Sequence, residues 1–142
     1  MAKINFVGFQ ENVEIPHGFS QVSFEEEIAT QLDKDDLFSY FAIPSKISEW
    51  FYPCQSLDSR AGGKVRFLDS TGTEVIATCT AVNLGREISF LSNLFGQLNI
   101  SVSKSGTTSK AHLQFLKLTD APEETVESYK NFIARLEEVI AQ

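Results

Sequence analysis

The apolar residues of the chain follow two different periods. In residues 22–28 every second position is largely apolar, and the same period recurs in five later stretches separated by turn-forming residues: 64–67, 74–82, 86–91, 98–103 and 111–115. A period of two predicts β-strands, and short strands joined by tight turns predict an antiparallel meander. The pattern therefore predicts a sheet of about six strands.

Three helices are predicted around these strands. Asp33 is a typical N-cap residue for a first helix, and Asp35 and Asp36 lie in its first turn, where the helix dipole favours acids. Pro44 suits the start of a second short helix, which we expect over residues 45–51. The last segment has apolar residues at spacings of three and four, which predicts one long amphipathic helix. These residues are Val126, Tyr129, Phe132, Ile133, Leu136, Val139 and Ile140.

The order of strand, two helices, five strands and helix predicts an α+β fold. A curved antiparallel sheet would wrap around the long C-terminal helix, and the two short helices would close one end. We expect residues 21–142 to form this domain and residues 1–20 to form an N-terminal extension. This extension is either an arm, packed along the sheet edge or on a second subunit, or a partly ordered tail.

Composition argues against several classes of protein. The 142 residues carry a formal net charge of −7, and the aromatic residues are 12 Phe, three Tyr and one Trp. The basic residues are scattered and form no concentrated positive patch, so nucleic acid is not expected as a partner. No apolar stretch approaches the roughly 20 residues of a membrane span. With no visible secretory signal, and with Cys54 and Cys79 as isolated cysteines, we expect a cytoplasmic protein with reduced thiols and no metal or cofactor.

One segment of the sequence resembles a known family. Pro44 leads a helix that ends in Trp50 and Phe51, Pro53 follows, and residues 58–67 read DSRAGGKVRF. These residues resemble the START-like (SRPBCC) superfamily, and within it the branch homologous to the C-terminal domain of the heat-shock-chaperone ATPase activator. The resemblance implies the helix-grip fold of the birch-pollen allergen, with a hydrophobic cavity between the sheet and the C-terminal helix.

The resemblance also implies a function, which is the binding of a small hydrophobic ligand, a lipid or an aromatic compound, in this cavity. Strand and helix periodicity predicts which apolar residues face inward, and Trp50 closes the end of the sheet. The expected lining is Trp50, Phe67, Phe90, Ile100, Leu113, Phe115, Tyr129, Ile133 and Leu136. The alternative is that these residues form a close-packed core without a cavity.

Glu26 and Arg60 are the polar candidates for the site. Strict alternation places Glu26 on the same strand face as Phe24 and Ile28, where a carboxylate is costly unless it is paired. Arg60 would either pair with Glu26 or bind a ligand carboxylate through two hydrogen bonds. The alternatives are that Glu26 lies in water at a bulge or an edge, and that Arg60 pairs with Asp58 in its own loop.

Two other functions stay open on the sequence alone. One is a protein-interaction role, as a co-chaperone-like or homodimeric protein whose partner is a chaperone or a second copy. The other is an enzyme similar to the polyketide cyclases and aromatases of the same superfamily. The sequence offers no Ser/His/Asp, Cys/His or paired-carboxylate arrangement, so no catalytic residue is predicted and ligand binding ranks first.

Overall fold

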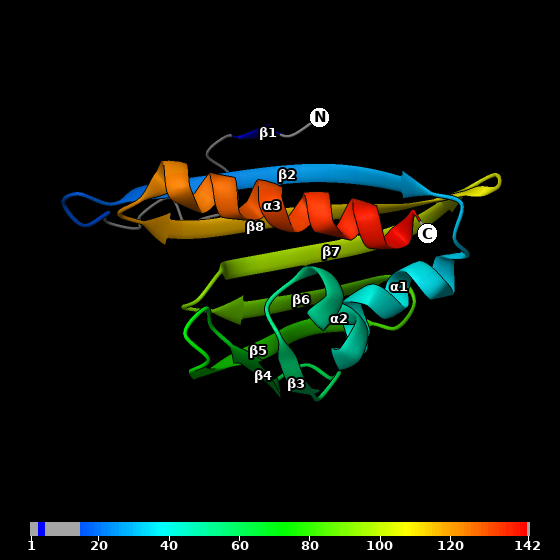
Figure 1. Ribbon diagram of the computed structural model, residues 1–142, viewed down its shortest axis with the longest axis horizontal. Helices are drawn as coiled ribbons and strands as arrows, with labels where there is room; N and C mark the ends of the chain where they lie inside the picture. Colours follow the sequence, from blue (N-terminus) through cyan, green and yellow to red (C-terminus); the bar gives the residue numbers. More distant parts are fainter. Residues whose placement is uncertain (1–2, 5–14, 142) are drawn as a thin grey trace.

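The computed structural model describes residues 3–4 and 15–141, in which one antiparallel sheet packs against three helices (Figure 1). The sheet order is β1-β2-β8-β7-β6-β5-β4-β3. The strands are β1 Lys3–Ile4, β2 Ser20–Thr30, β3 Cys54–Leu57, β4 Gly63–Leu68, β5 Glu74–Asn83, β6 Glu87–Ser92, β7 Gly96–Ser105 and β8 Thr108–Thr119. The helices are α1 Lys34–Ala42, α2 Pro44–Trp50 and α3 Pro122–Ile140. Helix α3 lies along β2 and β8, whereas α1 packs on β6, β7 and β8, and α2 packs on β3.

The sheet has more strands than the sequence predicted. All six predicted strands are present, but β3 adds a seventh, and the two-residue β1 pairs with β2 opposite Glu25 and Phe24. Strand β3 is four residues long, and its register with β4 shifts between Cys54 and Ser56. A period of two cannot be seen in so short and irregular a strand. The prediction of about six strands therefore missed the two short edge strands, β1 and β3.

The predicted helices are confirmed, with small shifts at their ends. Asp33 caps α1, since its carboxylate accepts a hydrogen bond of 3.2 Å from the backbone N–H of Asp35. Helix α1 ends before Pro44 because a residue that precedes proline is pushed out of the helical conformation, and Ile43 is extended. Helix α3 spans 19 residues, and its buried side is the predicted apolar stripe.

The inner face of the sheet, which α3 covers, is set by the pairing of β2 with β8 and of β8 with β7. Phe24 lies opposite Phe115, and Phe115 lies opposite Leu98. All three side chains are fully buried. Residues opposite one another in neighbouring strands share a face of the sheet. Phe24, Phe115 and Leu98 therefore mark the face that points toward α3.

Phe51 is the centre of the aromatic cluster that joins the helices to the sheet. It follows α2 directly and is 3% exposed. Its ring contacts five other rings at centroid distances of 4.7 to 5.6 Å, which belong to Trp50, Tyr52, Phe67, Phe95 and Phe132. These residues come from α2, the segment after it, β4, the β6–β7 loop and α3, so one side chain joins five parts of the fold.

Arg135 of α3 fixes the end of α2 from the other side. Its guanidinium donates hydrogen bonds of 2.9 and 3.2 Å to the carbonyl of Trp50 and one of 3.3 Å to the carbonyl of Phe51. The indole N–H of Trp50 donates to the carbonyl of Tyr40 at 2.7 Å. These bonds satisfy carbonyls that the helix ends leave without a partner.

We expect Phe51→Ala to lower the free energy of unfolding by about 3–5 kcal/mol, because it opens a cavity among five packed rings. Urea unfolding followed by circular dichroism measures the change. The control is Leu84→Ala, at a residue that is 70% exposed, for which we expect a change within about 0.5 kcal/mol. Similar losses in the two variants would contradict the role assigned to Phe51.

The two cysteines are free and buried. Burial raises the pKa of the Cys54 thiol to about 11, from an ordinary value of 9.0. Between these values the folded state binds more protons than the unfolded state, so the free energy of unfolding falls as the pH rises.

From pH 8.5 to pH 10.5 we therefore expect the wild-type protein to lose about 1–2 kcal/mol more stability than Cys54→Ala. Urea unfolding of both proteins at both pH values measures the difference. An equal loss in the two proteins would show that the Cys54 thiol does not titrate in this way.

Candidate functional site

The nine apolar residues predicted to line a cavity lie together between the sheet, α3 and the short helices. Each is at most 4% exposed. The ring of Phe115 stacks on that of Tyr129 with a centroid distance of 4.2 Å, and Phe24 lies 6.0 Å from Tyr129. At this point, the space between sheet and helix is occupied by the protein's own rings.

The two predicted polar residues lie in different parts of the fold. Glu26 is half-buried and lies opposite Leu113, on the inner face of the sheet. Arg60 lies in the turn before β4, at the other end of the sheet order, with its side chain 79% exposed. Its Nε donates to the carboxylate of Asp58 at 2.9 Å. The structure therefore does not bring Glu26 and Arg60 together, and the Asp58 pairing is the alternative that the sequence left open.

A cleft of about 290 Å³ opens where α3 begins. We call it the α3 N-terminal cleft. Tyr52 lines it from the segment after α2, and Leu94 from the β6–β7 loop. The end of β8 and the first two turns of α3 supply the remaining lining residues: Lys117, Thr119, Asp120, Ala121, Glu124, Thr125, Ser128 and Tyr129.

The floor of this cleft is aromatic. The ring of Tyr52 lies 4.9 Å from that of Phe132 and 6.4 Å from that of Phe95. The hydroxyl of Tyr129 donates a buried hydrogen bond of 2.8 Å to the carbonyl of Phe95. Burial raises the pKa of both Tyr52 and Tyr129, with a smaller contribution to Tyr52 from Asp69, so both hydroxyls stay protonated at neutral pH. The cleft thus leads directly to the aromatic cluster around Phe51.

Lys117 is the basic residue of the cleft. It continues the inward row of Leu113 and Phe115 and lies opposite the buried Val22, so its stem is on the inner face. Its ammonium donates to the carbonyl of Leu94 at 3.1 Å. This is its one bond within the described chain, so two of its three N–H groups are left for another acceptor. Burial lowers the pKa of Lys117, which indicates that its charge is poorly solvated.

Sequence reasoning missed Tyr52 and Lys117. The signal for Lys117 was present, because it lies two positions after Phe115 on the same strand and alternation puts both on one face. A lysine is more common on the solvent face of a strand, so residue type and alternation point to opposite faces at this position. Tyr52 follows the helix in an irregular segment, for which periodicity makes no prediction.

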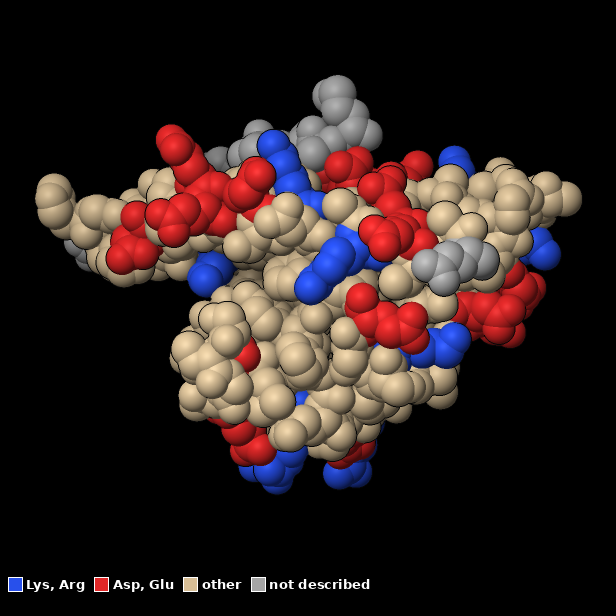
Figure 2. Space-filling model, in the orientation of Figure 1, with Lys and Arg blue, Asp and Glu red and all other residues tan. Residues whose placement is uncertain are grey.

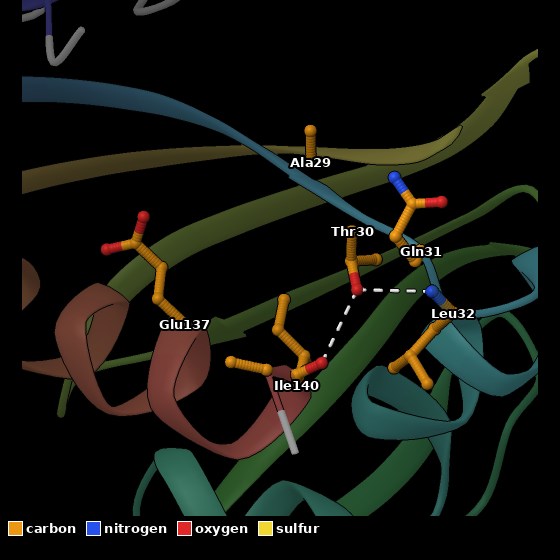
Figure 3. Close-up of a pocket in the computed structure, with 7 residues that line it drawn as sticks. Ala29, Thr30, Gln31, Leu32, Glu137 and Ile140 are labelled. Atoms are coloured by element: carbon orange, nitrogen blue, oxygen red, sulfur yellow. Dashed lines mark hydrogen bonds between the residues drawn. The ribbon is translucent and has the colours of Figure 1, made fainter. Parts of the chain in front are cut away.

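A second cleft, of about 480 Å³, opens at the other end of α3 (Figure 3). We call it the α3 C-terminal cleft. It is lined by residues 29–32, at the end of β2 and just after it, and by Glu137, Ile140 and Ala141. The hydroxyl of Thr30 donates to the carbonyl of Ile140 at 3.4 Å and accepts the backbone N–H of Leu32 at 3.2 Å.

Two further observations concern metal ions and membranes. In residues 3–4 and 15–141, no three His, Cys, Asp or Glu side chains are grouped so that they could hold a metal ion. Over the same residues, none of the helices combines the length and the apolar character needed to cross a membrane.

The fold is similar to several solved structures at low sequence identity. CalU16 from Micromonospora echinospora has a TM-score of 0.65 and 15% identity, over 82% of this chain and 72% of that one. A conserved protein of unknown function from Enterococcus faecalis has a TM-score of 0.70 and 12% identity, over 90% of this chain and 75% of that one. The Aha1 dimer from Colwellia psychrerythraea has a TM-score of 0.66 and 8% identity, over 84% of this chain and 96% of that one.

No family model and no curated protein matches the chain. At identities this low, the likeness to solved structures shows the fold alone. The chain therefore has the helix-grip, START-like fold that its motif implied, and the narrower branch remains a prediction.

We expect Tyr129→Phe to lower the free energy of unfolding by about 1–2 kcal/mol, because it leaves the buried carbonyl of Phe95 without its donor. The control is Tyr40→Phe, which removes the hydroxyl of a half-buried tyrosine outside the cleft. Thermal and urea unfolding of both variants measure the difference. If the two changes cost the same, the Tyr129 bond is not what fixes the floor of the cleft.

Proposed function

We propose that the protein binds a small aromatic or otherwise apolar molecule in the α3 N-terminal cleft, through an oxygen acceptor that faces Lys117. The observation that carries the proposal is a poorly solvated ammonium with two available N–H groups beside an aromatic floor. Most of the lining residues of the cleft are polar, and its apolar surface comes from the rings of Tyr52 and Tyr129 and from Leu94 and Ala121. A ligand site combines such apolar surface with polar groups that fix orientation.

The charges around Lys117 favour a neutral acceptor over an anionic one. Asp120 and Glu124 line the same cleft and are exposed at its rim. With one basic and two acidic side chains, the cleft repels a carboxylate more than it attracts one, whereas a ketone carbonyl accepts from the ammonium without that repulsion. An aromatic ketone therefore fits better than the corresponding acid.

The size of the cleft limits the ligand to one or two rings. Its volume of about 290 Å³ lies at the lower end of the roughly 300–1,000 Å³ of small-molecule sites. A longer hydrophobic ligand would reach from here into the space between sheet and helix. The predicted lining begins there with Tyr129, and such a ligand would have to displace rings that are now packed. Binding in that deeper space remains a prediction.

The other functions considered for this sequence remain predictions as well. One structural neighbour is described as a dimer, which is the observation in favour of self-association. A chaperone partner and a cyclase-like activity rest on the sequence resemblance alone.

Acetophenone, ethylbenzene and benzoate test the proposal, because they share a ring and differ in the acceptor. We expect acetophenone to bind most tightly, with amide NMR shifts at Leu94 and Lys117 and in the first turns of α3. Lys117→Met should lower the affinity for acetophenone about tenfold or more, because it removes one hydrogen bond from a charged donor. It should change the affinity for ethylbenzene less than about twofold.

Lys110→Met is the matched control, since Lys110 lies on the same strand but opposite Ala29 and beside Glu27, on the outer face. It should leave all three affinities unchanged. Equal binding of acetophenone and ethylbenzene, or equal effects of the two lysine variants, would exclude the assigned role of Lys117. Lys117→Arg keeps a cation at this position and shows whether a loss comes from misfolding.

A further inference from the structure

The nitrogen of Lys117 is fixed on one side and open on the other. The stem of Lys117 follows the inward row of β8, and its Nζ donates to the carbonyl of Leu94 at 3.1 Å. The side chain is half-buried and lines the α3 N-terminal cleft. A neutral lysine amine has two N–H groups and a lone pair, so with one N–H bound to Leu94 the lone pair is left for a ligand in the cleft.

Burial favours the neutral amine of Lys117 over its ammonium. The loss of water around the charge lowers the pKa of Lys117, and the negative charge of Asp120 opposes this effect and is the smaller of the two. Only a neutral amine attacks a carbonyl carbon, so Lys117 has a larger reactive fraction at neutral pH than a fully solvated lysine.

The function proposed above brings a carbonyl group to this nitrogen. A ketone and an aldehyde are both neutral acceptors, so both avoid the repulsion that Asp120 and Glu124 exert on a carboxylate. Aldehydes react with amines far more readily than ketones do, because a hydrogen replaces one of the two bulky, electron-donating carbon substituents. An aromatic aldehyde therefore combines the fit of the ketone with a reactive carbon.

Thr119 and Thr125 supply a hydroxyl to the same cleft. Thr119 is the next inward position of β8 after Lys117, and its hydroxyl lies 3.0 Å from that of Thr125. One hydroxyl of the pair donates to the other, so one hydroxyl hydrogen is left in either arrangement. A donor of this kind stabilises the negative charge that develops on a carbonyl oxygen when its carbon is attacked.

We propose that Lys117 forms a reversible imine with an aromatic aldehyde in the α3 N-terminal cleft, an inference that rests on the function proposed above. The lone pair of Nζ attacks the carbonyl carbon, and the electron pair of the C=O bond moves to oxygen, which takes up a proton that the nitrogen loses. The resulting hydroxyl takes a second proton from water and leaves as water while the C=N bond forms. The product is a protonated imine, and the step needs no oxidant or reductant.

The charges of the cleft favour this product. The protonated imine carries a positive charge at the nitrogen, and Asp120 and Glu124 line the cleft around it. Figure 2 shows acidic side chains gathered over the start of α3, whose first turn contains Glu123 and Glu124. The same negative charges that repel a carboxylate therefore attract the cationic imine.

Reductive trapping tests the proposal on the unmodified protein. Benzaldehyde with sodium cyanoborohydride converts an imine into a stable benzylamine at neutral pH. Because the α-amino group of a chain reacts as well, peptide mapping by mass spectrometry is used to measure the labelling rate of each lysine. We expect Lys117 to be labelled at least about fivefold faster than Lys46, since burial enlarges its neutral fraction.

Lys46 is the internal control, because it is also half-buried and its Nζ lies 4.6 Å from the centre of the Tyr40 ring, but it does not line the cleft. Labelling of Lys117 that is no faster than that of Lys46 would overturn the proposal. In Lys117→Arg, which keeps a cation and forms no imine, the rate at Lys46 should be unchanged.

Formaldehyde repeats the experiment with an aldehyde that has no ring. The ratio of labelling at Lys117 to labelling at Lys46 should be at least about threefold higher with benzaldehyde than with formaldehyde, because only benzaldehyde contacts the aromatic floor. An equal ratio would also overturn the proposal, since Lys117 would then react without binding an aromatic aldehyde.

The acetophenone titration separates this proposal from the function on which it rests, because it measures binding without bond formation. If acetophenone binds while benzaldehyde labels Lys117 no faster than Lys46, the imine is excluded and the binding function stands. If acetophenone does not bind and the two aldehydes give the same labelling ratio, both proposals fail.

Discussion

The packing of Phe51 between α2, α3 and the sheet is the contact on which the rest of the structure depends. Its ring lies 4.7 Å from that of Phe132 on α3 and 5.6 Å from that of Phe67 on β4. Arg135 holds the same junction through the carbonyls of Trp50 and Phe51. A long amphipathic helix is not stable without an apolar surface to cover, and these contacts fix how far α3 lies from the strands.

The same junction shapes the α3 N-terminal cleft, in which we propose that a ligand binds. Tyr52 follows Phe51 directly, so the position of Phe51 places the Tyr52 ring in the floor of the α3 N-terminal cleft. The tight packing of Phe115 on Tyr129 fills the space farther inside. Within the described residues, one cleft opens at each end of α3. The two clefts differ in chemistry, since one contains a lysine and the other a glutamate with no ion pair among the described residues.

Much of the fold could be predicted from the sequence, because it depends on periodicity. The alternation around Phe115 and the helical stripe around Leu136 place six strands and α3 correctly. Periodicity does not give the distance between facing side chains, so it could not decide between a cavity and a packed core. It also makes no prediction for irregular segments, and for that reason Tyr52 was missed. For Lys117, residue type indicates the solvent face and alternation indicates the inner face, and the structure agrees with the alternation.

The measurement that tests this account most directly is a crystal structure of the protein with acetophenone. The account predicts that the ring lies against Tyr52, that the ketone oxygen is within hydrogen-bond distance of the Lys117 ammonium, and that the stack of Phe115 on Tyr129 is unchanged. A ligand found between Phe115 and Tyr129, with the two rings separated, would contradict it and would support the deeper cavity instead.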